Sequence, residues 1–243
     1  MINSIILEIV ACTPTLRYYA RMQRNSKPKK KASRKLGLPP RTTKHFKPST
    51  AAGVQVKFSR GINGTDSILL DPKPQIAFVG RSNVGKSSTI NAILGAVVAR
   101  TSSTPGKTQE INFFEVGGKG YFVDLPGYGY ARMTDEAKDK IRKHIAWYIT
   151  SGEAKPKMLV LILDARVGAT EHDRELIGLA RQEGHPLLII ANKIDKLSGN
   201  DRPKVMTKLV EEFPDADIIQ FSASKKDNVT LVRKMLFGLL GIK

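Results

Sequence analysis

The stretch GRSNVGKSS, from Gly80 to Ser88, places two glycines, a lysine and two serines directly after an apolar run. Gly80, Gly85, Lys86 and Ser87 fit the spacing G-x-x-x-x-G-K-[ST]. Glycines let the backbone wrap closely, so that several N–H groups point at one anion, and a following helix adds the positive end of its dipole. We therefore predict a nucleotide-phosphate loop, in which Lys86 reaches the β- and γ-phosphates and the Ser87 hydroxyl binds Mg²⁺.

A D-x-x-G turn, from Asp124 to Gly127, ends a later apolar run. A carboxylate in this place holds a Mg²⁺-bound water, and the Gly127 N–H can donate to a γ-phosphate oxygen. The same four residues alone would be an ordinary turn. Their position after a predicted strand, downstream of the phosphate loop, favours a second phosphate contact.

The turn NKID, from Asn192 to Asp195, predicts guanine as the base. Guanine offers two donors on one edge, N1–H and the 2-amino group, and one carboxylate accepts both. Adenine would leave that carboxylate unpaired, which costs enough to discriminate strongly. Asp195 is thus the predicted specificity residue, while Asn192 and Lys193 frame the base. In the later turn SAS, from Ser222 to Ser224, the backbone N–H of the central alanine is placed to donate to guanine O6.

Apolar runs of strand length recur after about residue 54, and helical patterns separate most of them. The predicted strands are 76–79, 111–116, 121–123, 158–163, 187–191 and 218–221, and the predicted helices are 86–94, 135–150, 171–183, 201–213 and 229–239. Thr170 and Asp173 predict a capping box. The alternation predicts a three-layer α/β fold with a mostly parallel six-stranded sheet, one antiparallel edge strand and helices on both faces. Ligands of such sheets bind at the carboxyl ends of the strands, where each of these motifs lies.

Charge divides the chain into two parts. Residues 1–50 contain twelve Lys or Arg and one acidic residue, Glu8, and so carry +11 of the formal +18. Their composition predicts a basic disordered extension over 1–52, followed by a globular domain over 53–243. So large an excess indicates a polyanionic partner. RNA is favoured over a membrane surface, because the extension lacks the interleaved large apolar residues of an amphipathic membrane helix.

A single cysteine, Cys12, excludes an intrachain disulfide and indicates a reducing compartment. No apolar run is long enough to span a bilayer, so we expect no stable membrane insertion. We expect a cytoplasmic protein. The alternative is a mitochondrial matrix protein, if residues 1–25, which are rich in Arg and poor in acids, form a presequence. Met22 is an alternative start.

The order of these motifs resembles that of the P-loop GTPases of the TrmE-Era-EngA-EngB-septin group, and most closely the EngB/YihA family of ribosome-biogenesis GTPases. The stretches that carry the resemblance are IAFVGRSNVGKSS, TSSTPGKTQEINFF, VDLPGYGYA, LILDARVGATEHDREL and FSASKK, within about residues 55–240. The resemblance implies GTP and GDP as ligands, Mg²⁺ as cofactor, and a role in late assembly of the large ribosomal subunit and in normal cell division and septation. Asn192 is a departure, since family members often have Thr there; because Asp195 is intact, we expect little change in affinity.

The resemblance also implies that Thr108 meets Mg²⁺ in the GTP state, beside Ser87 and Asp124. Lys86, Thr108 and Gly127 are then the residues that act on the γ-phosphate. The full set of expected nucleotide contacts is Gly80, Arg81, Ser82, Asn83, Val84, Gly85, Lys86, Ser87, Ser88, Gly106, Lys107, Thr108, Asp124, Gly127, Asn192, Lys193, Asp195, Ser222, Ala223 and Ser224.

Hydrolysis raises a separate question, because many relatives place a water-orienting glutamine where this chain has Tyr128. We expect slow turnover until a partner arrives. Asn83 is a candidate ligand for a stimulating K⁺ ion, and the alternative is that it only suits the turn. We expect Tyr128, Tyr130 and Arg132 to be exposed to a partner, with an ordinary loop as the alternative.

Three functions fit these observations. The first is a regulatory GTPase that acts on large-subunit precursors through ribosomal RNA and is a monomer off the ribosome. The second is an RNA-binding assembly module with negligible turnover. The third is a membrane-associated septation GTPase.

Overall fold

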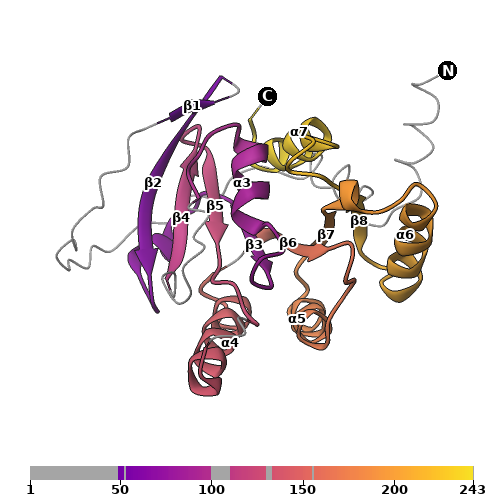
Figure 1. Ribbon diagram of the computed structural model, residues 1–243. Coiled ribbons are helices and arrows are strands. Elements are labelled where there is room, and N and C mark those ends of the chain that lie inside the picture. The colour runs from indigo at the N-terminus through magenta and orange to yellow at the C-terminus, as the bar shows by residue number, and fades with distance from the viewer. Residues whose placement is uncertain (1–48, 52, 100–109, 130–132, 155, 243) are drawn as a thin grey trace.

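The computed structural model describes residues 49–51, 53–99, 110–129, 133–154 and 156–242. Its sheet has eight strands in the order β1-β2-β4-β5-β3-β6-β7-β8, and Figure 1 shows this order from one edge to the other. The strands are β1 (Ser49–Ala51), β2 (Val54–Ile62), β3 (Gln75–Gly80), β4 (Ile111–Val116), β5 (Gly120–Asp124), β6 (Pro156–Asp164), β7 (Leu187–Asn192) and β8 (Asp217–Gln220).

The sheet confirms the predicted α/β class but has eight strands rather than six. β5, β3, β6, β7 and β8 pair in parallel, whereas β4 pairs antiparallel with both β5 and β2, and β1 pairs antiparallel with β2. The missed strand β2 is alternately buried and exposed, and a bulge between Phe58 and Arg60 interrupts its register. Such an edge strand lacks the continuous apolar run that marks the central strands. Because β1 begins at Ser49, the sheet starts before the predicted domain boundary at 53.

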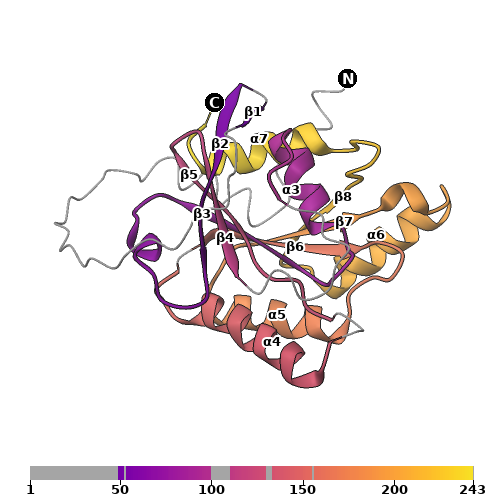
Figure 2. The same ribbon diagram turned by 60° about the vertical axis from the view of Figure 1, so that its left-hand side comes forward.

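Helices cover both faces of the sheet (Figure 2). The helices are α3 (Lys86–Leu94), α4 (Asp135–Thr150), α5 (Glu171–Gln182), α6 (Asp201–Glu212) and α7 (Val229–Leu239), with short 3₁₀ turns η1 (Ser67–Leu70) and η2 (Ile194–Lys196). α3 and α7 pack on one face, where Phe78 and Phe122 are buried. α4, α5 and α6 cover the other face.

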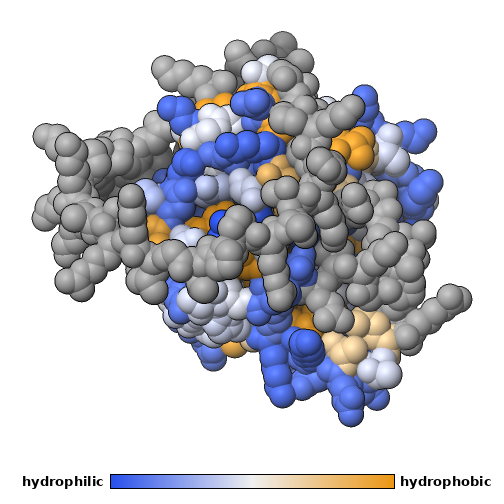
Figure 3. Space-filling view, turned by 90° about the vertical axis from the view of Figure 1, so that its left-hand side faces the viewer, coloured by the Kyte–Doolittle hydropathy of each residue, from blue (hydrophilic) through white to orange (hydrophobic). Residues whose placement is uncertain are grey.

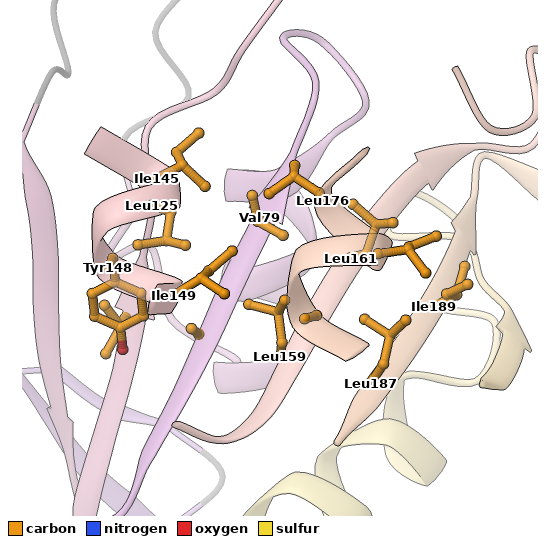
Figure 4. Packing of buried hydrophobic residues seen from close by; sticks show 14 of the residues in the cluster. Val79, Leu125, Ile145, Tyr148, Ile149, Leu159, Leu161, Leu176, Leu187 and Ile189 are labelled. Atoms are coloured by element: carbon orange, nitrogen blue, oxygen red, sulfur yellow. The ribbon is translucent and has the colours of Figure 1, made fainter. Parts of the chain in front are cut away.

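Residues from α4 and α5 meet alternate residues of the central strands in the second core. Figure 4 shows Ile145 and Ile149 of α4 beside Val79 of β3, and Leu176 of α5 near Leu161 of β6. All five side chains are largely or fully buried. Central strands with apolar side chains on both faces are thereby excluded from water, which is why their sequence runs are continuously apolar.

Local signals set the helix ends that matter for the site. The predicted capping box of α5 is present, with Thr170 and Asp173 each bonding the other's backbone N–H. The phosphate-loop residue Gly85 caps α3 with a φ of 96°, a backbone conformation that favours glycine.

Hydrophilic side chains predominate on the face of the molecule at the β1–β2 edge, with only small separate apolar patches among the coloured residues (Figure 3). Within the described residues, no helix is both long and apolar enough to cross a membrane. Most of the basic extension, residues 1–48, lies outside the described residues.

Candidate nucleotide-binding site

The phosphate loop links the end of β3 to the start of α3. Two of its glycines are required by close approaches. A Cβ on Gly80 would lie 2.6 Å from the carbonyl oxygen of Ile162, and a Cβ on Gly85 would collide with the side-chain amide of Asn192. Asn83 has a φ of 66°, which asparagine tolerates better than most residues. The loop is therefore held tightly between two neighbouring strands.

Lys86 and Asp124 meet at the centre of the site. The Lys86 Nζ donates to Asp124 Oδ1, and the two side chains are 11% and 8% exposed. Ser87 occupies the first turn of α3, next to this pair in sequence. A hydroxyl and a carboxylate are the hard oxygen donors that Mg²⁺ prefers, and phosphate oxygens complete such a set when nucleotide is bound. The residues present therefore fit a Mg²⁺ ion, with Ser87 and Asp124 as its protein ligands.

The D-x-x-G turn lies against the phosphate loop. A Cβ on Gly127 would stand 3.6 Å from both the Gly80 carbonyl oxygen and the Ser82 backbone nitrogen. The expectation that Tyr128 is exposed is wrong, because its side chain is only 2% exposed and donates a hydrogen bond to Asp173 of α5. Burial, followed by the charge of Asp173, raises the pKa of Tyr128.

Asn192 joins the guanine turn to two other loops. Its Nδ2 donates to the Val84 carbonyl oxygen of the phosphate loop at 2.8 Å, and its Oδ1 accepts from the Ala223 backbone N–H at 3.2 Å. Ala223 is the residue whose N–H we expected to face guanine O6, so in the structure that amide has a protein acceptor. Asn192 is 3% exposed and acts as a brace between the three loops.

The predicted specificity carboxylate of Asp195 is fixed by the serine turn after β8. Ser222 donates its hydroxyl to Asp195 Oδ1 at 2.6 Å, and this bond lowers the pKa of Asp195. Ser224 lies within 3.2 Å of the same hydroxyl. The carboxylate is therefore ionised at neutral pH, as an acceptor of the two guanine donors must be.

Sequence reasoning missed the carboxylate that holds Lys193. The Lys193 Nζ donates to Asp164 Oδ2 at 2.9 Å and to the Asn83 carbonyl oxygen at 2.5 Å. Arg166 donates to the same carboxylate through Nε at 2.9 Å and Nη2 at 2.6 Å. Burial alone would raise the pKa of Asp164, but the bonds from Arg166 and Lys193 outweigh it and lower the pKa to about 2.

A cavity of about 580 Å³ opens beside the phosphate loop. Arg81, Ser82 and Asn83 form one wall, and Arg166 and Thr170, near the start of α5, form another. The predicted contacts Gly106, Lys107 and Thr108 lie outside the described residues, as do Tyr130 and Arg132. The remaining predicted contacts gather at the carboxyl edge of the sheet, at the ends of β3, β5, β7 and β8.

A phosphate loop, a magnesium carboxylate and a guanine-reading turn on one edge of this sheet define the class of P-loop GTPases. A sequence-family profile described as "50S ribosome-binding GTPase" matches residues 75–193. A probable GTP-binding protein EngB from Koribacter versatilis is 42% identical over 176 residues, which cover 69% of this chain and 85% of the relative. One of the same name from Aquifex aeolicus is 38% identical over 152 residues, covering 63% and 83%. The chain belongs to the EngB family of GTP-binding proteins.

Solved structures agree with this assignment. The crystal structure of a probable GTP-binding protein EngB matches with a TM-score of 0.59 and 26% identity, covering 69% of this chain and 98% of that one. Era from Aquifex aeolicus bound to GDP and AlF₄⁻ matches with a TM-score of 0.52 and 22% identity, covering 68% and 56%. The second likeness shows the shared fold alone. Membership of the family implies binding of GTP and GDP.

Proposed function

We propose that this protein is a GTP-hydrolysing switch that assists late assembly of the large ribosomal subunit. The observation that carries the proposal is the combination of a complete guanine-nucleotide site with a family profile named for binding to the 50S ribosome. The +11 charge of residues 1–50 supports it, because Lys and Arg contacts to phosphate give salt-sensitive binding to RNA of many sequences. A role in normal cell division and septation follows from the family resemblance as a consequence of that assembly function.

Slow hydrolysis without a partner is part of the proposal. A water-orienting side chain is normally placed directly after the D-x-x-G turn. Here that place belongs to Tyr128, which is buried and bonded to Asp173. The phenol therefore has no access to an attacking water, and the group that aligns this water must come from elsewhere, such as a bound cation or the ribosomal subunit.

Asn83 is our candidate for a K⁺ ligand that supplies part of this function. Lys193 fixes its carbonyl oxygen, which holds the backbone in its left-handed conformation and leaves the side-chain amide at the exposed rim of the cavity. An amide oxygen is a suitable ligand for K⁺. We expect GTP hydrolysis to be faster in K⁺ than in Na⁺ and expect Asn83→Ala to abolish the difference. Equal wild-type rates in the two salts would remove this part of the proposal.

Co-sedimentation with free large subunits tests the ribosomal role. We expect the full chain to bind in the presence of a non-hydrolysable GTP analogue and to be released with GDP. A chain lacking residues 1–48 keeps β1 and the rest of the sheet, so its weaker, less salt-dependent binding would report the extension alone. Nucleotide-independent binding, or none with either nucleotide, would refute the switch.

The second candidate is an RNA-binding assembly module with negligible turnover, which the burial of Tyr128 also favours. Single-turnover hydrolysis with and without large subunits separates the two. Stimulation by the subunit identifies the switch, and unchanged slow hydrolysis identifies the module. Flotation with anionic vesicles at physiological salt tests the septation GTPase at a membrane surface, and binding there without binding to subunits would replace the ribosomal proposal.

A further inference from the structure

The side chain of Tyr128 joins the γ-phosphate turn to a helix on the far side of the cavity. Its hydroxyl donates to Asp173 Oδ1, and its ring meets the His172 ring edge-on, with centroids 6.4 Å apart and planes at 89°. Both partners lie in the first turn of α5. A buried phenol with a charged acceptor makes a strong hydrogen bond that cannot be exchanged readily for water.

Asp173 divides its two carboxylate oxygens between two tasks. Oδ2 accepts from the Thr170 backbone N–H at 2.7 Å and from the Thr170 hydroxyl at 2.6 Å, which completes the cap of α5. Oδ1 accepts from Tyr128. Asp173 is 2% exposed, and the positive end of the α5 dipole favours its charge. Only one of the two oxygens is needed for the cap, so the cap leaves the second oxygen without an explanation.

The backbone of Tyr128 is fixed at the other side, to the phosphate loop. The Ser82 N–H donates to the Tyr128 carbonyl oxygen at 2.7 Å, and Arg81 forms a parallel bridge with Tyr128. Gly129 follows with a φ of 71°, and a Cβ there would lie 3.1 Å from the Arg81 side chain. Tyr128 is therefore held from two directions, and Gly127 just before it is held with it.

We propose that Tyr128 and Asp173 are positioning residues for GTP, which keep the Gly127 N–H in place for the γ-phosphate before that phosphate arrives. The proposal rests on the GTPase assignment and adds a role for α5 in sensing the third phosphate. Ordering a backbone segment on ligand binding weakens affinity, and a segment that is already ordered avoids this loss. GDP makes no γ-phosphate contact, so losing the pair should weaken binding of GTP selectively.

A purely structural role for Asp173 as the cap of α5 predicts a different outcome. Loss of a cap destabilises the fold but affects GDP and GTP alike. Thr170→Ala removes the hydroxyl bond of the cap and leaves the bond between Tyr128 and Asp173 in place. Tyr121→Phe is a second control, because Tyr121 also donates from a buried phenol to a carboxylate, Asp71 at 2.8 Å, at the opposite end of β5.

The test compares dissociation constants for GDP and for a non-hydrolysable GTP analogue, both with Mg²⁺. We expect Tyr128→Phe and Asp173→Ala each to lower the preference for the analogue over GDP about tenfold. Because both substitutions break one bond, the double variant should lose little more than either single one. Tyr121→Phe and Thr170→Ala should keep the wild-type preference even where they lower the melting temperature.

Three outcomes overturn the proposal. They are a folded Tyr128→Phe protein with the wild-type preference, a Thr170→Ala protein that loses as much preference as Asp173→Ala, and fully additive losses in the double variant. The wild-type chain supplies a further measurement that needs no variant. In its GDP complex the Ser82 amide, which bonds Tyr128, should exchange slowly with deuterium, and rapid exchange would show that the anchor does not persist. Wild-type binding of both nucleotides is measured first, so a failure of the GTPase assignment is recognised separately.

Discussion

Replacing Asp164 with asparagine tests whether the carboxylate at the end of β6 holds the guanine-framing lysine. Asn keeps the shape of the side chain and removes its charge, so Lys193 and Arg166 lose their anionic partner. The pKa of Asp164 falls from an ordinary 3.8 to about 2, which corresponds to roughly 2.5 kcal/mol of stabilisation. We reduce this to about 1–2 kcal/mol because Arg166 is 49% exposed and water screens its charge.

Nucleotide affinity should fall with this loss of stability. Lys193 frames the base and fixes the Asn83 carbonyl oxygen, and both contacts are common to GTP and GDP. We therefore expect Asp164→Asn to weaken both nucleotides by about fivefold to thirtyfold, the factor for 1–2 kcal/mol. The measurement is the dissociation rate of a fluorescent GDP analogue, together with urea unfolding. Asp215→Asn is the matched control, because Asp215 pairs with Arg181 away from the nucleotide site.

The same substitution predicts a dependence on pH. The pKa of Asp164 is lower in the folded chain than in the unfolded chain, so its contribution is complete above about pH 4 and is lost as the pH falls towards 2. The difference in unfolding free energy between wild type and Asp164→Asn should therefore shrink below pH 4. A GDP dissociation rate that matches the wild type, or a stability difference that is independent of pH, would refute the reasoning.

Two further substitutions probe base selection and the support of the phosphate-loop helix. Asp195→Asn replaces an acceptor with a donor, so preference should move from guanine nucleotides to xanthine nucleotides, which competition against fluorescent GDP measures; retained selectivity for GTP would contradict it. Arg233 of α7 donates to the carbonyl oxygens of Ala92 and Ile93 in α3 at 2.9 Å and 2.5 Å. Arg233→Ala should lower the free energy of unfolding by about 1–3 kcal/mol in urea, with GDP binding retained.

The central part of the fold is predictable because its elements obey one strong rule each. The strand predicted at 111–116 and the helices predicted at 86–94, 135–150 and 229–239 have the observed bounds. Continuous apolar runs marked the buried strands, and a hairpin turn marked the antiparallel pair β4–β5. β2 was missed because one face of it is exposed and a bulge shifts its alternation after Phe58. The rule for central strands does not apply to such an edge.

The candidate site divides in the same way. Residues at the carboxyl ends of strands were found, because a parallel sheet brings those ends together. Asp164 follows the predicted strand 158–163 directly, so the same rule applied to that strand would have identified it. The bond between Tyr128 and Asp173 had no such signal. The sequence marked Asp173 as a helix cap, but which residue uses its second oxygen depends on the packing of a distant loop.

Asn192 shows how the structure explains a departure from the family pattern. Its amide donates to the Val84 carbonyl oxygen and accepts from the Ala223 N–H, so one side chain needs one donor and one acceptor. A threonine hydroxyl supplies both from a single oxygen, which is a physical reason for either residue to serve here. Asn192→Thr should therefore keep GDP affinity within a fewfold of wild type. Valine has the shape of threonine without the hydroxyl, and Asn192→Val leaves two buried backbone groups unpaired, each at a cost of about 1–3 kcal/mol. We expect at least a tenfold loss of GDP affinity for Asn192→Val, and equal affinities for the two variants would show that the brace does not contribute to binding.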